Sequence, residues 1–310
     1  MKILVTGCAS HLAGACLPVL LDDDRIQQII GIDLKPSDFR HAKYQEHLAD
    51  IRSNDLVQHL DDIDAMIHLA FVVNNGNLGK QRFDRDYIRS VNVAGSKHVF
   101  ELAAQHNVKT VIHMSSAIVY GMDEANPQFM PESQSLKPIE GFYYSEDKVA
   151  VEHFLDGYEL QHPNLRVVRF RPHVVLGEHT QPLVKALLKQ PYYFLFPDPQ
   201  PLMQCISEVD VATAMLQALF NDVRGSYNLA TDQVASFHLI QKHLRNFAFP
   251  LPFGLAKRCH NLAWRYSGRY GDPAWLDCLQ YSLTIDNEKA KQELNWAPTL
   301  NLFDCLDATF

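Results

Sequence analysis

Short runs of apolar residues alternate with amphipathic stretches along the first half of the chain. Continuous apolar runs predict buried strands, and apolar residues spaced three or four apart predict helices. The predicted strands are residues 2–6, 28–32, 45–49, 65–69, 110–114 and 165–171, and the predicted helices include residues 11–21, 84–106 and 145–160. Strands that are buried on both faces and separated by helices are typical of parallel sheets. The pattern therefore predicts an α/β fold of the Rossmann type, a doubly wound parallel sheet whose ligands bind beyond the carboxyl ends of its strands.

The second half of the chain has a different composition. Proline clusters at residues 191–201, and aromatic residues and prolines crowd residues 247–252. We expect a dinucleotide-binding domain over residues 1–171, with residues 205–235 returning to it. The remaining segments, residues 172–204 and 236–310, are expected to form a smaller, mixed α/β substrate-binding lobe.

Composition narrows the class of protein. The 310 residues are 47% apolar and 21% charged, which is ordinary for a globular protein of about two domains. A net charge of −8 argues against a nucleic-acid partner. No segment reaches the roughly 20 apolar residues that span a bilayer, and the start of the chain does not resemble a secretory signal. Six scattered cysteines without a C-x-x-C pair predict reduced thiols, and the 15 histidines show no metal-binding spacing. We therefore expect a cytoplasmic protein without a transmembrane segment or a metal.

The first predicted strand leads into the sequence T-G-C-A-S-H-L-A-G at residues 6–14. A glycine-rich turn between a strand and a helix presents backbone N–H groups to a pyrophosphate. Gly7 fits this role, and the amides of Ser10, His11 and Leu12 would face the phosphates. The turn departs from the usual T-G-x-x-G-x-x-G, because Ser10 and Ala13 replace two glycines. Ala13 still permits close packing, whereas Ser10 adds a Cβ where phosphate would approach, although its hydroxyl is a possible donor.

Asp33 ends the second predicted strand, nineteen residues after Gly14. An acid at this place accepts hydrogen bonds from both ribose hydroxyls of NAD and repels the 2′-phosphate of NADP. NAD is therefore the expected cofactor, and Lys35 leaves NADP as the less favoured one. Residues that follow the third and fourth strands complete the expected cofactor site: Asp50 and Ile51 beside adenine, and Leu69 and Ala70 toward nicotinamide.

A group of residues suited to proton transfer follows the fifth strand. Ser116 comes just after that strand, and Tyr144 and Lys148 lie 28 and 32 residues further on. Tyrosine and lysine four residues apart share one face of a helix. We expect the ammonium of Lys148 to lower the pKa of Tyr144 from about 10 toward working pH. Tyr144 would then act as a general acid and base during hydride transfer, while Ser116 holds the substrate oxygen.

Several further motifs extend this pattern over nearly the whole chain. They are H-L-A at 68–70, N-V-A-G-S at 92–96, S-S-A-I-V-Y-G at 115–121, Y-S-E-D-K at 144–148, R-P-H-V-V-L-G at 171–177, S-Y-N-L-A at 226–230 and E-K-A-K-Q-E-L-N-W-A-P at 288–298. With these motifs the chain resembles an extended short-chain dehydrogenase/reductase of the NAD-dependent epimerase/dehydratase family. The resemblance implies that Ser116, Tyr144 and Lys148 are catalytic. It also implies that Asn92, Tyr144, Lys148 and Pro172 contact the cofactor, Lys148 at the nicotinamide ribose.

Departures from the family's motifs bear on the reaction. Dehydratases carry an acidic pair where this chain has Ala117 and Ile118, so sugar dehydration is disfavoured. Nucleotide-sugar epimerases carry an Asn where Val174 stands and an Arg near Met203 and Gln204, to grip a diphosphate. The leading hypothesis is therefore an NAD-dependent oxidoreductase acting on a secondary alcohol or ketone. The alternatives are a UDP-sugar 4-epimerase, which returns the hydride, and a non-catalytic dinucleotide-binding scaffold.

The second lobe is rich in aromatic residues, including Tyr192, Phe194, Phe247 and Phe249. They either form the core of that lobe, which is the simpler interpretation, or line a pocket for an apolar alcohol or ketone. Leu255, Cys259, Leu262 and Tyr266 recur at helical spacing, which predicts a helix facing the core in preference to one lying on a membrane surface. The family resemblance further implies a homodimer in which residues 84–106 and 144–160 pair across a two-fold axis.

Overall fold

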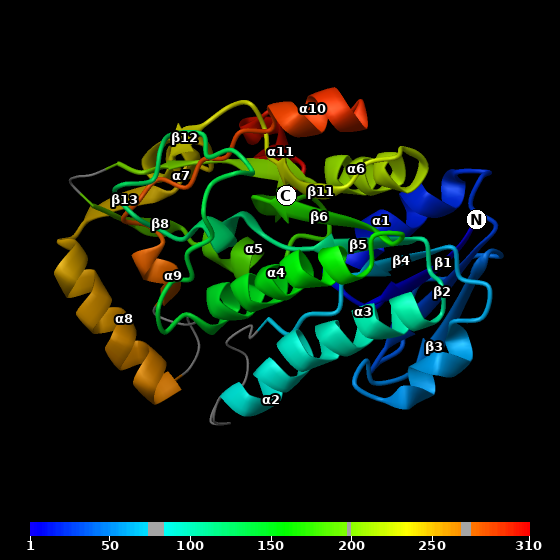
Figure 1. The fold of residues 1–310 in the computed structure, drawn as a ribbon. Helices are drawn as coiled ribbons and strands as arrows, with labels where there is room; N and C mark the ends of the chain where they lie inside the picture. Colours follow the sequence, from blue (N-terminus) through cyan, green and yellow to red (C-terminus); the bar gives the residue numbers. More distant parts are fainter. Residues whose placement is uncertain (74–83, 197–199, 268–273) are drawn as a thin grey trace.

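The computed structural model describes residues 1–73, 84–196, 200–267 and 274–310. Within these residues seven strands form one sheet: β1 (Lys2–Thr6), β2 (Gln28–Asp33), β3 (Tyr44–Leu48), β4 (Ala65–His68), β5 (Thr110–Met114), β6 (Arg166–Pro172) and β11 (Gly225–Leu229). Their order is β11-β6-β5-β4-β1-β2-β3, and all neighbouring pairs are parallel. Figure 1 shows the sheet crossing the molecule between its helices. This architecture confirms the predicted Rossmann-type fold.

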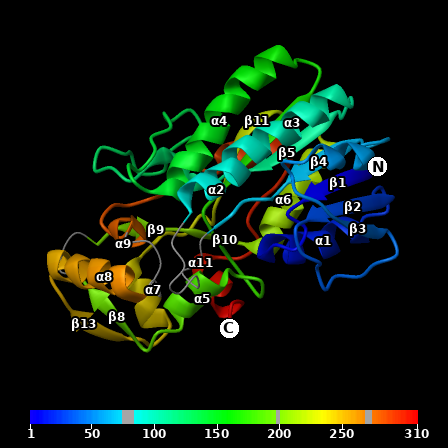
Figure 2. The same ribbon diagram turned by 90° about the horizontal axis from the view of Figure 1, so that it is seen from below.

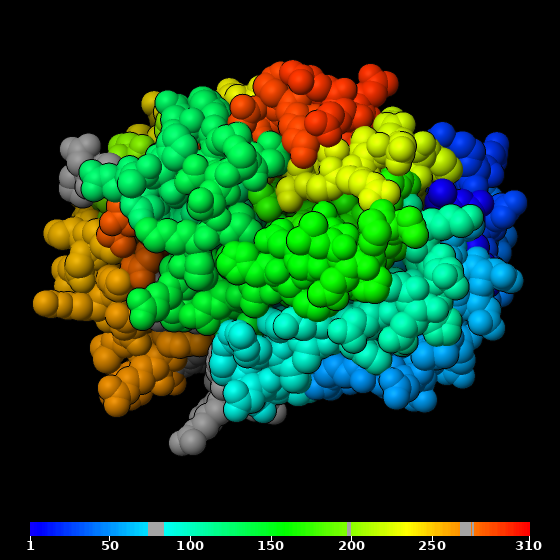
Figure 3. All heavy atoms as spheres, in the orientation of Figure 1, coloured from blue at the N-terminus to red at the C-terminus, as the bar shows by residue number. Residues whose placement is uncertain are grey.

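Helices cover both faces of the sheet. The helical segments around it are α1 (His11–Asp22), η1 (Asn54–His59), α2 (Arg85–Arg89), η2 (Ser90–Gly95), α3 (Ser96–Gln105), η3 (Ala117–Tyr120), α4 (Tyr143–Gln161), α6 (Glu208–Phe220) and α10 (Glu288–Leu294). Figure 2 shows α2, α3 and α4 on one side of the sheet and α1 and α6 on the other. Figure 3 shows α4 on the surface beside the continuous helical run of α2, η2 and α3. The two-sided cover explains why the inner strands β1, β2 and β4 are largely apolar.

Alternating side chains of the inner strands enter two separate cores. In β1, Ile3 and Val5 pack with α1 and α6, whereas Leu4 packs with α3 and α4. All three are at most 1% exposed. Because successive side chains of a strand point to opposite faces, a five-residue strand contributes to both cores. The strand ends are therefore held in place from both sides.

The remaining elements lie mostly beyond the carboxyl ends of β5 and β6. They are β7 (Val174–Leu176), α5 (Pro182–Leu188), β8 (Tyr192–Leu195), β9 (Leu202–Met203), β10 (Cys205–Ser207), β12 (Ala235–Ser236), α7 (Phe237–His243), β13 (Phe247–Pro250), α8 (Phe253–Ser267), α9 (Ala274–Asp277) and α11 (Leu302–Asp307). Three two-stranded sheets occur among them, β10-β7, β12-β9 and β13-β8. Figures 1 and 2 place β8, β13 and α8 at the end of the molecule opposite β3. The division into two domains stays a prediction.

The expectation that the stripe on α8 faces the core is wrong. Leu255, Leu262 and Tyr266 are 49%, 58% and 79% exposed, and Cys259 is also exposed. The helix instead turns Ala256, which is 1% exposed, toward the protein. Within the described part of the chain, none of the helices is long and apolar enough to cross a bilayer.

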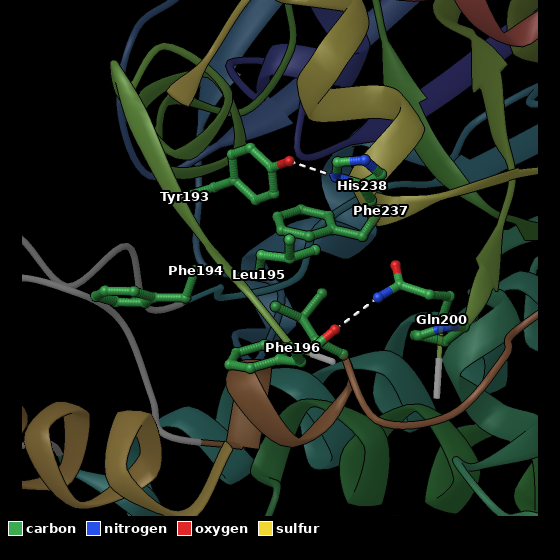
Figure 4. A pocket seen from close by; sticks show the side chains of 9 residues that line it. Tyr193, Phe194, Leu195, Phe196, Gln200, Phe237 and His238 are labelled. Carbon is green, nitrogen blue, oxygen red and sulfur yellow. Dashed lines mark hydrogen bonds between the residues drawn. The ribbon is translucent and has the colours of Figure 1, made fainter. Parts of the chain in front are cut away.

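The aromatic residues of the second lobe do not all belong to its core, contrary to the simpler interpretation. Tyr193 and Phe196 are buried, whereas Tyr192, Phe194, Phe247 and Phe249 are exposed. The cavity beside Tyr193 and Phe237 has a volume of about 10 Å³, room for about one water molecule. Figure 4 shows Phe194 pointing away from these side chains. As it stands, this cavity is too small for an organic substrate.

Candidate active site

Gly7 lies where the order of the sheet reverses, between β1 and β4. Its φ is +76°, and a Cβ there would lie 2.5 Å from the main-chain nitrogen of Ala70 and 2.7 Å from the carbonyl carbon of Leu69. Only glycine fits such a close approach without strain. The turn after β1 therefore touches the segment after β4, at the crevice where doubly wound sheets bind ligands.

The turn leads directly into the amino-terminal end of α1. The hydroxyl of Ser10 accepts a hydrogen bond of 3.3 Å from the amide of Ala13 and caps the helix. Within the described residues, no hydrogen bond satisfies the main-chain N–H groups of His11 and Leu12. Free amides and the positive end of a helix dipole suit a pyrophosphate, so this turn fits the expected cofactor despite its missing glycines.

Gly14, one turn further along α1, supports a second close contact. A Cβ at Gly14 would lie 2.7 Å from the imidazole of His179. That imidazole is held by the carboxylate of Glu208, 3.0 Å from its Nδ1. The pKa of His11 is lowered by burial and by the nearby basic groups His179 and Lys35. Three basic side chains therefore gather at the predicted phosphate site of a chain whose net charge is negative.

Asp33 stands at the carboxyl end of β2 and faces the same turn. Its carboxylate accepts hydrogen bonds from the main-chain amides of Ala9, at 3.0 Å, and Leu34, at 2.7 Å. These bonds fix the acid beside the glycine turn, at the place expected for a ribose partner. They also leave lone pairs for hydroxyl donors, because a carboxylate can accept about four hydrogen bonds.

Asp50 and Ile51 follow β3 and reach the neighbouring helices. The carboxylate of Asp50 is paired with the guanidinium of Arg52, at 2.6 Å, and Arg52 also donates to the hydroxyl of Ser90. Ile51 is 5% exposed, and a Cβ at Gly95 would lie 2.7 Å from it. Part of the hydrogen-bonding capacity of the Asp50 carboxylate is therefore used by Arg52. The side chain of Ile51 forms an apolar surface against η2.

Ser116, Tyr144 and Lys148 come together where β5 meets α4. Ser116 precedes η3, and its hydroxyl accepts a 3.3 Å hydrogen bond from the amide of Ile118. It also lies close enough to the phenol of Tyr144 to lower the pKa of that group. Lys148, one helical turn after Tyr144, donates a 2.6 Å hydrogen bond to the carbonyl of Met114. The three residues that the sequence singled out as catalytic thus form one contiguous group.

The electrostatics of this group differ from the expectation. Burial raises the pKa of Tyr144 above its ordinary value, and the nearby hydroxyl of Ser116 opposes that rise. Burial also lowers the pKa of Lys148 to about 7, against the opposing influence of Glu152 and Asp147. The expected lowering of the Tyr144 pKa by Lys148 is not seen, because burial dominates and Ser116, not Lys148, is the group that opposes it.

An aromatic ring that the sequence analysis did not assign a role lies between the two catalytic candidates. The amino group of Lys148 stands 3.7 Å from the ring centroid of Phe71, over its face. The ring of Tyr144 meets Phe71 edge to face, with the centroids 5.7 Å apart. Phe142 lies on another side of Tyr144, at 6.0 Å. The position of Phe71 near the site could have been inferred from the sequence, because H-L-A-F at residues 68–71 places an aromatic residue just beyond β4.

Asn92 and Asp147 connect the site to the neighbouring helix. Asn92 lies in η2, a π-helical segment between α2 and α3, and is fully buried. Its amide is hydrogen-bonded to both main-chain groups of Val72 and to the carboxylate of Asp147. Asp147, also fully buried, is paired with Arg85 at 2.7 Å. Asn92 therefore fixes the segment after β4, and π-helical insertions of this kind are frequent at functional sites.

Glu152 continues the same face of α4 two turns beyond Tyr144. It is fully buried, and its carboxylate is paired with Arg171 at 2.9 Å and with Arg169 at 3.2 Å. Both arginines belong to β6 and are 4% exposed. Arg171 lowers the pKa of Glu152 against the effect of its burial. Pro172, predicted to lie near the cofactor, is the buried last residue of β6.

Two buried histidines lie beneath the site. His68 is hydrogen-bonded through Nδ1 to the hydroxyl of Thr6, at 2.7 Å, and through Nε2 to that of Ser96, at 2.8 Å. His113 stacks on His68 with the ring centroids 5.7 Å apart. Neither ring nitrogen of His113 has a partner in the described residues. Burial lowers the pKa of His68 to about 3 and that of His113 well below its ordinary value.

The positions expected to grip a diphosphate hold no charge. Val174 is 44% exposed and apolar. Gln204 is buried, and its amide group is used internally: its nitrogen donates to the carbonyl of Thr231, at 2.7 Å, and its oxygen accepts from the amide of Ile285, at 2.8 Å. Neither side chain can take the place of an asparagine or an arginine toward a phosphate.

Comparison with known proteins agrees with this arrangement. The chain is 27% identical to a UDP-glucose 4-epimerase of Yersinia enterocolitica, over 99% of this chain and 95% of the relative. It is 28% identical to a UDP-glucose 4-epimerase of Halalkalibacterium halodurans, over 96% and 91%. Its fold resembles UDP-glucose 4-epimerase of Thermotoga maritima with UDP-glucose (TM-score 0.77, 20% identity, 100% and 97% covered).

A UDP-glucuronic acid 4-epimerase of Bacillus cereus in complex with NAD is also similar in fold, with a TM-score of 0.76 and 21% identity over 99% of this chain and 97% of that one. The model of the NAD-dependent epimerase/dehydratase family matches residues 3–230. This match confirms the resemblance read from the motifs and the expectation of NAD as cofactor. The chain is an enzyme of the NAD-dependent epimerase/dehydratase family.

Proposed function

We infer that this enzyme transfers hydride at a secondary alcohol or ketone carbon, with Tyr144 as the acid and base. The observation that carries the proposal is the group formed by Tyr144, Ser116 and Lys148 at the carboxyl edge of β5. In it a phenol, a hydroxyl and an amine lie together in a largely apolar setting. Such a group suits proton transfer to one substrate oxygen.

NAD, when bound, accepts the hydride from the alcohol carbon or donates it to the ketone carbon. Gly7, Ser10, His11 and Leu12 would hold its pyrophosphate, and Asp33 its ribose. Asp50, Ile51, Leu69, Ala70, Asn92, Lys148 and Pro172 would line the rest of the cofactor site.

Tyr144 would hold the proton that the oxygen gains or loses. In the reducing direction its phenol donates H⁺ to the carbonyl oxygen as the carbon gains hydride, and the product is an alcohol. In the oxidising direction the phenolate accepts that proton. Since burial raises the pKa of Tyr144, the phenol is the resting form, which suits donation. The ammonium of Lys148 and the hydroxyl of Ser116 would stabilise the phenolate left behind.

The leading substrate class is a weakly charged alcohol or ketone that is released after one hydride transfer. Support comes from the uncharged Val174 and the internally bonded Gln204. It also comes from the apolar residues beside Tyr144, among them Phe71 and Phe142. A substrate bearing a diphosphate would lack the strong charged hydrogen bonds that these two positions provide elsewhere.

The second candidate is a UDP-sugar 4-epimerase, which the relatives named UDP-glucose 4-epimerase favour. It would use the same proton transfer twice, with the hydride returned to the opposite face of the sugar.

Turnover assays separate these candidates. The protein with NAD is incubated with a panel of secondary alcohols and, separately, with UDP-glucose. Accumulation of free NADH in proportion to ketone supports the oxidoreductase. Conversion of UDP-glucose to UDP-galactose without net NADH supports the epimerase. The matching ketones are tested with NADH for the reverse reaction. If the protein binds NAD but none of these substrates is converted, the proposed chemistry is wrong for both classes.

A further inference from the structure

The end of the molecule formed by β8, β13 and α8 has an exposed aromatic face. In the β8–β13 pair, Phe247 lies beside Tyr192 and Phe249 beside Phe194. Residues paired in this way, and residues two apart, point to the same face of a sheet. The four rings are 38–78% exposed, whereas Tyr193, on the opposite face, is buried and bonded to His238 (Figure 4). One face of this small sheet therefore packs inward, and the other presents four rings to the outside.

Helix α8 begins three residues after β13 and continues the apolar surface. At 100° per residue, Leu255, Cys259, Leu262 and Tyr266 fall within an arc of about 60°. All four are exposed. Exposed apolar patches of this kind mark interaction sites. We call the four rings and this stripe together the apolar end.

Positive charge gathers at the same end. The 35 described residues from Gln233 to Ser267 contain five Lys or Arg and no Asp or Glu, whereas the other 275 residues contain 23 Lys or Arg and 36 Asp or Glu. On α8, Arg258 and Arg265 lie next to the apolar stripe and are exposed. Lys257 is paired with Asp277, but within the described residues neither arginine has an ion pair. A cationic and apolar surface thus stands on a protein that is otherwise acidic.

We propose that the apolar end docks on an anionic lipid bilayer surface. Aromatic and leucine side chains would enter the boundary between headgroups and acyl chains, and Arg258 and Arg265 would contact acidic headgroups. Charge argues against a second copy as the partner, because two such surfaces facing each other would repel. Leu255 and Leu262 argue against nucleic acid, since aliphatic side chains offer no ring for base stacking.

Vesicle co-sedimentation of the whole protein tests the proposal. We expect binding to vesicles of phosphatidylcholine mixed with phosphatidylglycerol, little binding to phosphatidylcholine alone, and weakening by added salt. The double variant Arg258→Glu/Arg265→Glu should bind the mixed vesicles at least about tenfold more weakly, because each surface cation contributes strongly near an anionic bilayer. Leu262→Gln should weaken binding several-fold.

Matched controls use exposed side chains elsewhere. Leu160→Gln removes a leucine that is 84% exposed on α4, and Lys109→Glu/Arg224→Glu reverses two exposed charges far from α8. Both controls should bind as the parent does, and thermal unfolding should confirm that all variants are folded. The proposal is overturned if the parent does not bind the mixed vesicles, or if controls and α8 variants lose binding equally. It is also overturned if the parent binds single-stranded RNA, or self-associates through α8, without binding vesicles.

Discussion

The amino group of Lys148 donates a 2.6 Å hydrogen bond to the main-chain carbonyl of Met114, the last residue of β5. Tyr144 lies one helical turn before Lys148, and Ser116 lies two residues after Met114. This bond therefore fixes the helix that carries the phenol against the strand end that carries the hydroxyl. The relative position of Tyr144 and Ser116 depends on a backbone carbonyl that no side-chain substitution removes.

Replacing Tyr144 by phenylalanine tests its role as acid and base. We expect Tyr144→Phe to reduce kcat by about 10²–10⁴-fold, the usual contribution of a positioned proton donor. NAD affinity should stay within a few-fold, because the ring and its contacts with Phe71 and Phe142 remain. Steady-state turnover and NAD titration by fluorescence measure the two effects.

Tyr158→Phe is the matched control on the same helix. The phenol of Tyr158 donates a hydrogen bond to the carbonyl of Phe100, far from the catalytic group. Its removal should lower the free energy of unfolding by about 1 kcal/mol and leave kcat unchanged. If Tyr144→Phe retained near-parental kcat, the proposed acid and base would have to be another residue.

Ser10 offers a direct test of the altered glycine turn. Ser10→Gly should change the stability by only a few tenths of a kcal/mol, because glycine is an acceptable helix cap. It should tighten NAD binding several-fold, since the Cβ near the phosphates is removed. Ser10→Ala, which keeps the Cβ and loses the cap, should lower the stability by about 1 kcal/mol and weaken NAD binding. Calorimetric titration measures NAD binding, and urea unfolding measures stability. If Ser10→Gly bound NAD more weakly, the Ser10 hydroxyl would instead be a ligand of the phosphates.

Asp33 is expected to set the preference for NAD over NADP. Asp33→Asn removes the charge that repels a 2′-phosphate and replaces charged hydrogen bonds to ribose with weaker ones. We expect NAD affinity to fall about tenfold or more and the ratio of NAD to NADP affinity to fall with it. Asp61→Asn, at an exposed acid remote from the turn, should change neither. An unchanged ratio in Asp33→Asn would remove Asp33 from the ribose site.

The sheet was predictable because several of its strands are largely apolar on both faces. Residues 2–6 and 110–114 were predicted to be buried strands, and the bounds of β1 and β5 agree with that prediction to within one residue. The helix at 84–106 was predicted as one element, but it contains the π-helical η2 around Asn92. That insertion depends on hydrogen bonds from Asn92 to Val72 and Asp147, which are distant in sequence, so periodicity does not reveal it.

The proximity of the three proposed catalytic residues could be predicted from their spacing, but their electrostatics could not. Ser116, Tyr144 and Lys148 lie together as their order along the chain implied. The raised pKa of Tyr144 and the lowered pKa of Lys148 come from burial against Phe71 and neighbouring elements. Likewise, periodicity identified the stripe on α8 but not its direction, because an apolar stripe follows the same spacing whether it faces the core or the outside.

Buried histidines should make the protein sensitive to acid. In the unfolded chain histidine has a pKa near 6.5, whereas burial lowers the pKa of His68 to about 3 and that of His173 to about 4. Between these values the unfolded state binds more protons than the folded state, so stability falls as pH falls below 6.5. Each such histidine should contribute a slope of about 1.4 kcal/mol per pH unit until its folded pKa is reached.

His113 and His68 form a matched pair for this effect. Each substitution by phenylalanine should flatten the pH dependence by about one proton, as measured by urea unfolding at a series of pH values. At pH 7, His68→Phe should lower the stability by about 1–3 kcal/mol, because the hydroxyls of Thr6 and Ser96 lose their partner. His113→Phe should leave it unchanged or higher. Equal losses for both would mean that His113 makes a hydrogen bond in solution.

The buried pairing of Glu152 with Arg169 and Arg171 acts as an anchor for α4. If the helix slid by one turn along the sheet, a carboxylate and two guanidinium groups would be left uncompensated in a low-dielectric interior, at a cost of several kcal/mol. We therefore expect α4 to keep its position on the sheet when ligands bind and leave. Tyr144, the proposed proton donor, would then keep the same place during each turnover.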